Sequence, residues 1–144
     1  YLSSYFERYR DDYYRHLLSV STQGTWKEWL TYFLTGVRET AKDALADTRR
    51  LIDLYDHYRR IMAQSKRVPG ACAGVLDALF AVPMFSISNY AERHDESFPN
   101  VAKAIAFWEK HGLVIEITKQ KRNRLFAAPP IMAITRPKPA EPTP

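Results

Sequence analysis

The chain has 144 residues and a single cysteine, Cys72, so neither an internal disulfide nor a cysteine-based zinc cluster can form within it. It contains no stretch approaching the roughly 18 consecutive apolar residues that a membrane span requires. Its first residues also lack the basic start and apolar segment of a secretory signal. These absences disfavour a secreted disulfide scaffold and a membrane protein, and we expect a cytoplasmic chain with no membrane partner.

The sequence also lacks the motifs that hold phosphates or metals. Its five glycines are scattered, so there is no glycine-rich phosphate loop. The four histidines lie far apart in the sequence, and none belongs to a His-Glu-x-x-His pair. They are His16, His57, His94 and His111. We therefore expect no catalytic, metal-binding or cofactor-binding residue in this chain.

Basic charge, by contrast, is present in excess and is unevenly placed. The formal net charge is +5. Residues 1–64 carry 10 Lys and Arg against 9 Asp and Glu, whereas residues 65–144 carry 11 against 7. A local basic excess favours an anionic partner, because neutralising phosphates releases counterions.

The first predicted helix is short. Ser4 and Glu7 have the spacing of a capping box, in which a hydroxyl and a carboxylate satisfy the first free amides of a helix. This spacing predicts a helix over about residues 4–19. It should stop near Gly24, because glycine readily adopts the left-handed conformation that ends helices.

The second predicted helix is long. Thr25 and Glu28 repeat the capping-box spacing, and no proline follows until Pro69. Within this window residues recur at alternating steps of four and three, which is a heptad seam. Its members are Leu30, Leu34, Val37, Ala41, Ala44, Thr48, Leu51, Tyr55, Tyr58 and Met62. Gly36 is the weak point of the helix, and a bend or break is expected there.

A seam of this length needs a partner. Three are considered: the helix over residues 4–19, a second copy of the chain, or protein absent from this sequence. Ala41 and Ala44 at the centre of the seam would permit close approach of another helix. The residues predicted to be buried along it, within the chain or between two copies, are Leu30, Val37, Ala44 and Leu51.

The second half of the chain alternates short helices and strands. Residues 66–70 contain both proline and glycine and are predicted to be a linker. A helix over 71–80 and a strand over 85–87 follow. Two helices come next, one capped by Ser88 and ending near His94, the other running from the Ser97 cap to Gly112. Strands over 113–118 and 124–127 and a last helical turn over 129–134 complete the unit.

This order of segments predicts the fold class. Helix, short strand, helix, turn, helix and β-hairpin within about sixty residues is typical of a winged helix-turn-helix. The sequence therefore predicts a mainly α protein in three parts. A long helical hairpin or bundle occupies residues 1–66, a winged helix-turn-helix with a small β-hairpin occupies residues 67–134, and a proline-rich tail occupies residues 135–144.

The second helix of such a motif enters the major groove of DNA by its N-terminal end. Ser97, Asn100 and Lys103 occupy that end. The Asn100 amide could pair with adenine through two hydrogen bonds, and Lys103 could reach guanine or a phosphate. The alternative for Ser97 is that it only caps the helix.

The expected hairpin tip is the most basic segment of the chain. Its cations are Lys119, Lys121, Arg122 and Arg124, with no acid among them. A wing in this position commonly lies along phosphates or in the minor groove, which favours DNA as the partner. The alternatives are a solvated turn and a wing that contacts protein.

Four sequence blocks resemble the C-terminal portion of Fic-family proteins, the region that follows the catalytic core in the longer bacterial members. They are Tyr1-Leu-Ser-Ser-Tyr-Phe-Glu-Arg, Tyr13-Tyr14, Gly24-Thr-Trp-Lys-Glu-Trp-Leu-Thr-Tyr-Phe-Leu and Ser97-Phe-Pro-Asn-Val-Ala-Lys-Ala-Ile. The resemblance extends to about Ile134.

Fic proteins transfer AMP from ATP to a hydroxyl of a target protein, using a His-Pro-Phe-x-x-Gly-Asn-Gly-Arg motif. Nothing in this sequence matches that motif, so no catalytic residue carries over and no activity is expected of the chain alone. The resemblance implies that the chain begins just after the motif, in a longer parent that would be a protein adenylyltransferase. It leaves two roles open: a DNA-binding or regulatory module, and a target-recognition or dimerisation arm. The partners implied are DNA, the missing Fic core and a second copy paired through the long helix.

Overall fold

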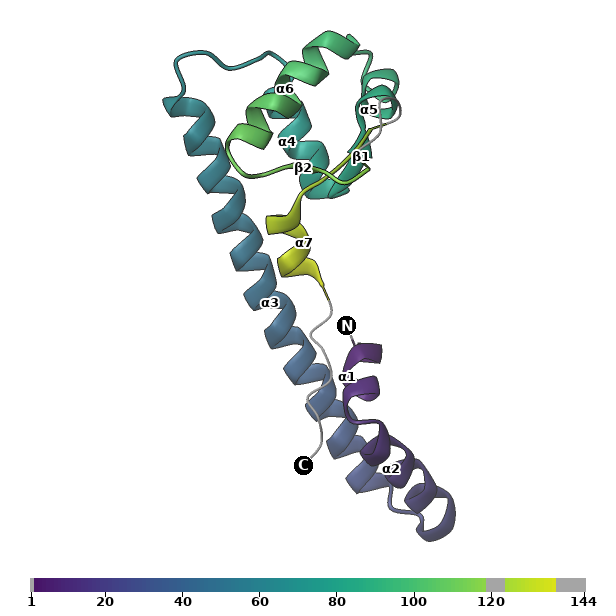
Figure 1. Ribbon diagram of the computed structural model, residues 1–144. Helices are drawn as coiled ribbons and strands as arrows, with labels where there is room; N and C mark the ends of the chain where they lie inside the picture. The colour runs from purple at the N-terminus through teal and green to yellow at the C-terminus, as the bar shows by residue number, and fades with distance from the viewer. Residues whose placement is uncertain (1, 119–123, 137–144) are drawn as a thin grey trace. The chain divides into compact units, whose positions relative to one another are not determined.

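The computed structural model describes residues 2–118 and 124–136. Within these residues the protein is mainly α-helical, with one small three-stranded antiparallel sheet, which confirms the prediction of a mainly α protein with a small β-hairpin (Figure 1). The chain divides into two compact units, an N-terminal unit that includes residues 2–49 and a C-terminal unit of residues 50–135. The division lies inside the long helix, so the last turns of that helix belong to the C-terminal unit.

The N-terminal unit begins with two helices where one was predicted. They are Leu2–Arg8 (α1) and Arg10–Gln23 (α2). The prediction of a single helix capped by Ser4 is wrong, because Ser4 lies inside α1 and the chain leaves helical geometry at Tyr9, with φ −112° and ψ 45°. The predicted end is confirmed: Gly24 has φ +68°, and its amide donates to the Val20 carbonyl.

The long helix is Trp26–Gln64 (α3), and it is continuous (Figure 1). The expected bend or break at Gly36 is therefore wrong. Gly36 instead allows a close approach, because a Cβ atom at this position would lie 2.7 Å from Cδ1 of the Tyr5 ring. The missing side chain makes room for α1 while the backbone stays helical.

An aromatic cluster holds α1 and α2 against the first turns of α3. Phe6 lies 5.0 Å from Tyr13 and 6.0 Å from Phe33 between ring centroids, and Tyr13 lies 5.7 Å from Trp29. The Tyr32 hydroxyl donates a hydrogen bond to the Tyr9 carbonyl at 3.2 Å. These contacts use a face of α3 that lies beside the predicted seam.

The first half of the seam is therefore exposed within the chain. Leu30 and Val37 are 51% and 40% exposed, so their predicted burial inside the chain is wrong. Helices α1 and α2 pack against Trp29, Tyr32 and Phe33 of α3 rather than against the seam residues. The second half behaves as predicted from Leu51 onward, where seam residues pack against the core of the C-terminal unit.

The C-terminal unit follows the predicted order of helices and strands (Figure 1). In chain order they are Cys72–Ala81 (α4), Met84–Ser86 (β1), Ile87–Arg93 (α5), Phe98–Lys110 (α6), Ile115–Glu116 (β2), Leu125–Ala127 (β3) and Pro129–Thr135 (α7). β3 is the central strand of the sheet and pairs antiparallel with β1 and with β2. The last segment forms a seven-residue helix rather than a single turn.

The cap of α5 differs from the prediction. The Oγ atom of Ser86 accepts a hydrogen bond from the Asn89 amide at 3.3 Å, and Ser88 lies within the helix. Ser86 is the last residue of β1, and its extended backbone provides the geometry that a capping residue needs. The prediction placed the cap two residues too late.

One hydrophobic core fills the C-terminal unit. It joins α4, α5 and α6 to the sheet, to α7 and to the last turns of α3. Trp108 is its largest fully buried side chain; Nε1 donates to the Cys72 carbonyl at 3.1 Å, and the ring meets that of Tyr58 edge-on. Cys72 is itself fully buried, and burial raises the pKa of its thiol to about 11.

Candidate nucleic-acid interface

The buried side chains of α6 fix the orientation of this helix about its own axis. Val101, Ala104, Ile105 and Trp108 are at most 1% exposed, as their spacing predicts. The helix begins at the Ser97 cap, whose Oγ accepts from the Asn100 amide at 3.4 Å, and this cap is confirmed. Gly112, with φ +74°, follows its last turn. A helix fixed at both ends and along one side presents a defined outer face.

The outer face consists of Pro99, Lys103, Ala106 and Lys110, which recur at steps of four, three and four residues and are all exposed. We call this surface the α6 face. Lys103 was predicted as a contact residue, whereas Lys110 was not. Its spacing of seven from Lys103 was the signal, since residues two turns apart share a helix face. Two cations flanking one small residue suit close approach to an anionic groove.

The side-chain amide of Asn100 is not free to pair with a base, as the predicted contact requires. Its Nδ2 donates to Oε2 of Glu96 at 2.8 Å, and its side chain is half-buried. A Cβ atom on Gly70 would lie 3.8 Å from the same Nδ2, so the segment before α4 passes beside the first turn of α6. To pair with adenine, the Asn100 amide would have to release Glu96. Ser97 is exposed, and the hydrogen bond described for its hydroxyl is the capping one.

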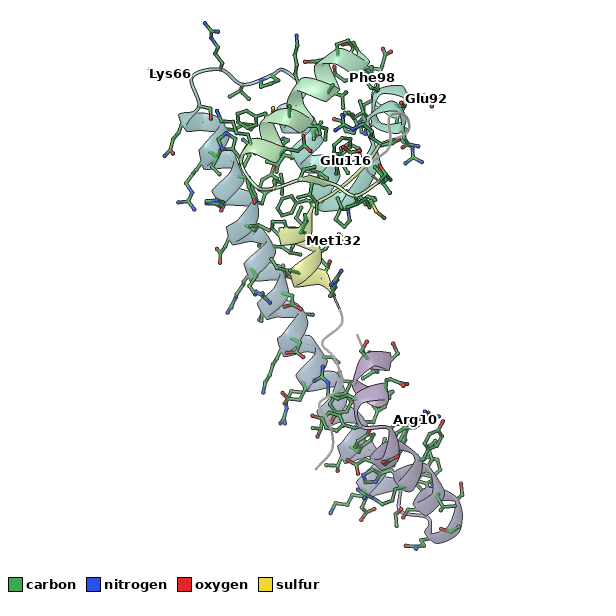
Figure 2. All side chains as sticks on the ribbon, viewed as in Figure 1. Arg10, Lys66, Glu92, Phe98, Glu116 and Met132 are labelled. Carbon is green, nitrogen blue, oxygen red and sulfur yellow. The ribbon has the colours of Figure 1, made fainter. Side chains whose placement is uncertain are left out.

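The turn between α5 and α6 is acidic. It contains Asp95 and Glu96, and Glu92 lies in the last turn of α5 (Figure 2). Asp95 has φ +51°, a conformation that Asp tolerates better than most residues. Carboxylates here disfavour phosphate contact at the start of α6. The cationic part of the helix therefore begins one turn later, at Lys103.

The base of the hairpin is well defined. Arg124 donates from Nη2 to Oε2 of Glu116 at 2.6 Å, and its guanidinium lies 5.0 Å from the centroid of the Phe126 ring. This hydrogen bond raises the pKa of Arg124 above its ordinary value. The Leu125 amide donates to Oγ1 of Thr118 at 3.1 Å, which joins the two sides of the hairpin.

These contacts divide the predicted wing cations. Arg124 is used within the hairpin base and positions it, so it is less available to a phosphate than the sequence suggested. The other three, Lys119, Lys121 and Arg122, lie outside the described residues. Two further cations that sequence reasoning missed, Lys66 and Arg67, are exposed on the segment that joins α3 to α4. Figure 2 labels Lys66, where this segment leaves α3.

Among the described residues, no group of three or more His, Cys, Asp and Glu side chains could hold a metal ion. A hollow of about 400 Å³ beside α2 and α3 contains His16, which stacks on the Tyr32 ring. The pKa of Tyr32 is raised to about 12, first by burial and then by Tyr5, so its hydroxyl stays protonated at neutral pH.

In the described part of the chain, no helix is both long and apolar enough to span a membrane.

No model of a known protein family matches the chain.

Proposed function

We propose that the C-terminal unit binds duplex DNA, with the α6 face in the major groove and with Lys119, Lys121 and Arg122 along the phosphates. The element order α4, β1, α5, α6, β2, β3 supports this proposal, because it is the order of a winged helix-turn-helix. The observation that carries it is the α6 face itself. The exposed helix face is cationic, with Lys103 and Lys110 on either side of Ala106, and the major groove of DNA is wide enough to admit an α-helix.

In this binding mode, the chain uses charge more than base reading. Lys103, Lys110 and the wing cations would neutralise phosphates, which gives affinity without sequence preference. Asn100 carries an amide in the first turn of α6, and it would contribute to specificity only by exchanging its Glu96 partner for a base. We therefore expect binding that weakens strongly with salt and discriminates modestly between sequences.

The test is fluorescence anisotropy with a mixed-sequence duplex at low salt. The double variant Lys103→Ala/Lys110→Ala should bind about tenfold more weakly or worse, because it removes two phosphate-neutralising charges from one face. Lys27→Ala/Lys42→Ala is the matched control, since it also removes two exposed helical lysines but from the N-terminal unit. Equal losses in both variants, or no binding by the parent chain, would reject the proposal.

We propose further that the chain is the non-catalytic C-terminal portion of a Fic-family protein. The support is the resemblance of the four sequence blocks, three of which lie in α1, α2 and the first turns of α3. The chain alone should then neither bind ATP nor transfer AMP, because the phosphate-cradling motif is missing. Incubation with labelled ATP and candidate proteins tests this, and reproducible label transfer above a matched blank would contradict it.

A second role for the C-terminal unit is the recognition of a protein target of such an AMP-transferase. One observation favours it: Phe98, at the start of α6, is 54% exposed beside the acidic turn (Figure 2). An exposed aromatic ring next to carboxylates suits a protein surface better than DNA. Phe98→Ala separates the two roles, because it should leave salt-dependent DNA binding within about twofold while weakening a protein contact.

A further inference from the structure

The N-terminal half of α3 exposes a continuous row of apolar side chains. Its members, which we call the apolar stripe, are Trp26, Leu30, Leu34, Val37, Ala41 and Leu45. The five large residues among them are 40% to 62% exposed. Since α1 and α2 pack on the neighbouring face through Trp29 and Phe33, the helices described for the N-terminal unit leave this row exposed.

The stripe is large enough for a specific interface. At on the order of 100 Å² of exposed apolar surface per large side chain, it presents roughly 500 to 600 Å² on one copy. This equals the largest apolar patch of about 300 to 600 Å² that a typical monomer exposes. It also approaches the roughly 600 to 1,000 Å² that each partner contributes to a stable complex, so a second stripe with its flanking residues would complete an interface.

The spacing of the stripe is the same in both directions. Its steps are four, four, three, four and four residues, so a second helix running antiparallel meets it in register. In that arrangement Trp26 lies opposite Leu45 of the other copy, Leu30 opposite Ala41, and Leu34 opposite Val37. Each pair joins a larger side chain to a smaller one, which lets the two rows interdigitate.

The charged side chains beside the apolar stripe do not favour a partner of the opposite charge over a second copy of this chain. Arg38 and Lys42 lie beside it, and both bond to Oε1 of Glu39, at 3.0 Å and 3.3 Å. Their charge is partly neutralised within the helix, so repulsion between two copies at this exposed flank is small. A self-complementary apolar row is then the dominant feature of this surface.

We infer that the apolar stripe is a dimerisation surface that binds a second copy of this chain, with the two α3 helices antiparallel. The interface is isologous, because the same residues on each copy make equivalent contacts about a two-fold axis. It also supplies the burial that the heptad pattern predicted and that the single chain does not provide. Dimer formation requires no nucleic acid, so the full chain alone is the sample.

Sedimentation velocity of the full chain should give twice the 16.7 kDa mass of one copy at micromolar concentration. Leu34→Glu should weaken the dimer by about 100-fold or more, because it places an unpaired carboxylate between two apolar rows. Leu18→Glu is the matched control: Leu18 is a leucine of similar exposure, 64% against 62%, on α2. A parent chain that stays monomeric at about 100 µM, or equal effects of both variants, would overturn the inference.

Disulfide trapping tests the register. Leu30→Cys and Ala41→Cys are made as separate variants with tags of different size. Residues 30 and 41 of one helix are about 16 Å apart, so a disulfide between these two positions must join two copies. Antiparallel pairing predicts a mixed disulfide only when the two variants are combined under oxidation. The parent chain is the baseline, since its Cys72 is fully buried. Cross-links within each variant alone would contradict the antiparallel arrangement.

Discussion

The two units of this protein differ in where their apolar side chains lie. In the C-terminal unit a continuous core surrounds Trp108, Phe126 and Leu76, all fully buried. Among the described residues of the N-terminal unit, none of the apolar side chains is fully buried, although many rings stack there. The C-terminal unit therefore has its own hydrophobic core, whereas the N-terminal unit is an incomplete layer that needs a partner.

The largest expected effect lies in the core of the C-terminal unit. Trp108→Ala removes a fully buried ring and the hydrogen bond to the Cys72 carbonyl, and it should lower the free energy of unfolding by about 3 to 5 kcal/mol. Trp26→Ala, at a tryptophan that is 61% exposed, should cost less than about 1 kcal/mol in the monomer. Urea unfolding at a concentration below dimer formation measures both. Equal losses would mean that the two units are equally packed.

Two glycines sharpen the same comparison at an intermediate scale. Gly74 is exposed on α4, but a Cβ atom there would lie 2.6 Å from the hydroxyl of Tyr90, whose side chain is buried, so Gly74→Ala should cost about 1 to 3 kcal/mol. Adding Tyr90→Phe should recover most of this loss, because it removes the colliding oxygen. Gly36→Ala meets the Tyr5 ring instead and should cost less, because that ring is half-buried and has more room to shift than the buried Tyr90 ring. Both glycines lie inside helices, so the better helix propensity of alanine offsets up to about 1 kcal/mol at each position.

Thermal unfolding of the four variants checks this prediction, with Tyr90→Phe alone as the reference for the rescue. A larger loss at Gly36 than at Gly74 would show that the N-terminal unit is the more tightly packed one. A double variant as unstable as Gly74→Ala would mean that the collision involves atoms other than the hydroxyl.

The smallest effect expected is a pH dependence in the N-terminal unit. The pKa of Tyr32 is raised to about 12, mainly by burial, so the folded state holds this proton more tightly than the unfolded chain does. Its contribution to stability is fully present below about pH 10 and is lost as the pH rises through about 12. The stability difference between the parent and Tyr32→Phe should therefore shrink between about pH 9 and 11.5. A stability difference that does not change with pH would show that the Tyr32 hydroxyl is exposed to solvent in the folded state.

Local chemistry made part of this structure predictable. The Ser97 cap and the left-handed glycines Gly24 and Gly112 follow from interactions within a few residues. The buried side of α6 follows from helical periodicity. These features depend on short sequence distances, and the sequence states them directly.

Choices between competing partners were not predictable in the same way. The seam and the ring-bearing face lie side by side on α3, and periodicity alone cannot say which one the hairpin takes. The hydrogen bonds from Asn100 to Glu96 and from Arg124 to Glu116 depend on how a turn and a hairpin close. They changed the candidate interface most, because they occupy two residues that the sequence assigned to DNA.

If the C-terminal unit binds DNA through positive charge, as we propose, then binding must weaken as the salt concentration rises. Each phosphate contact contributes about −0.9 to the slope of log K against log salt. Lys121→Ala/Arg122→Ala should therefore reduce the magnitude of that slope by roughly two while leaving sequence preference unchanged. A parent chain whose binding to a mixed duplex pool is absent at low salt, or a slope that the variant leaves unchanged, would contradict the account.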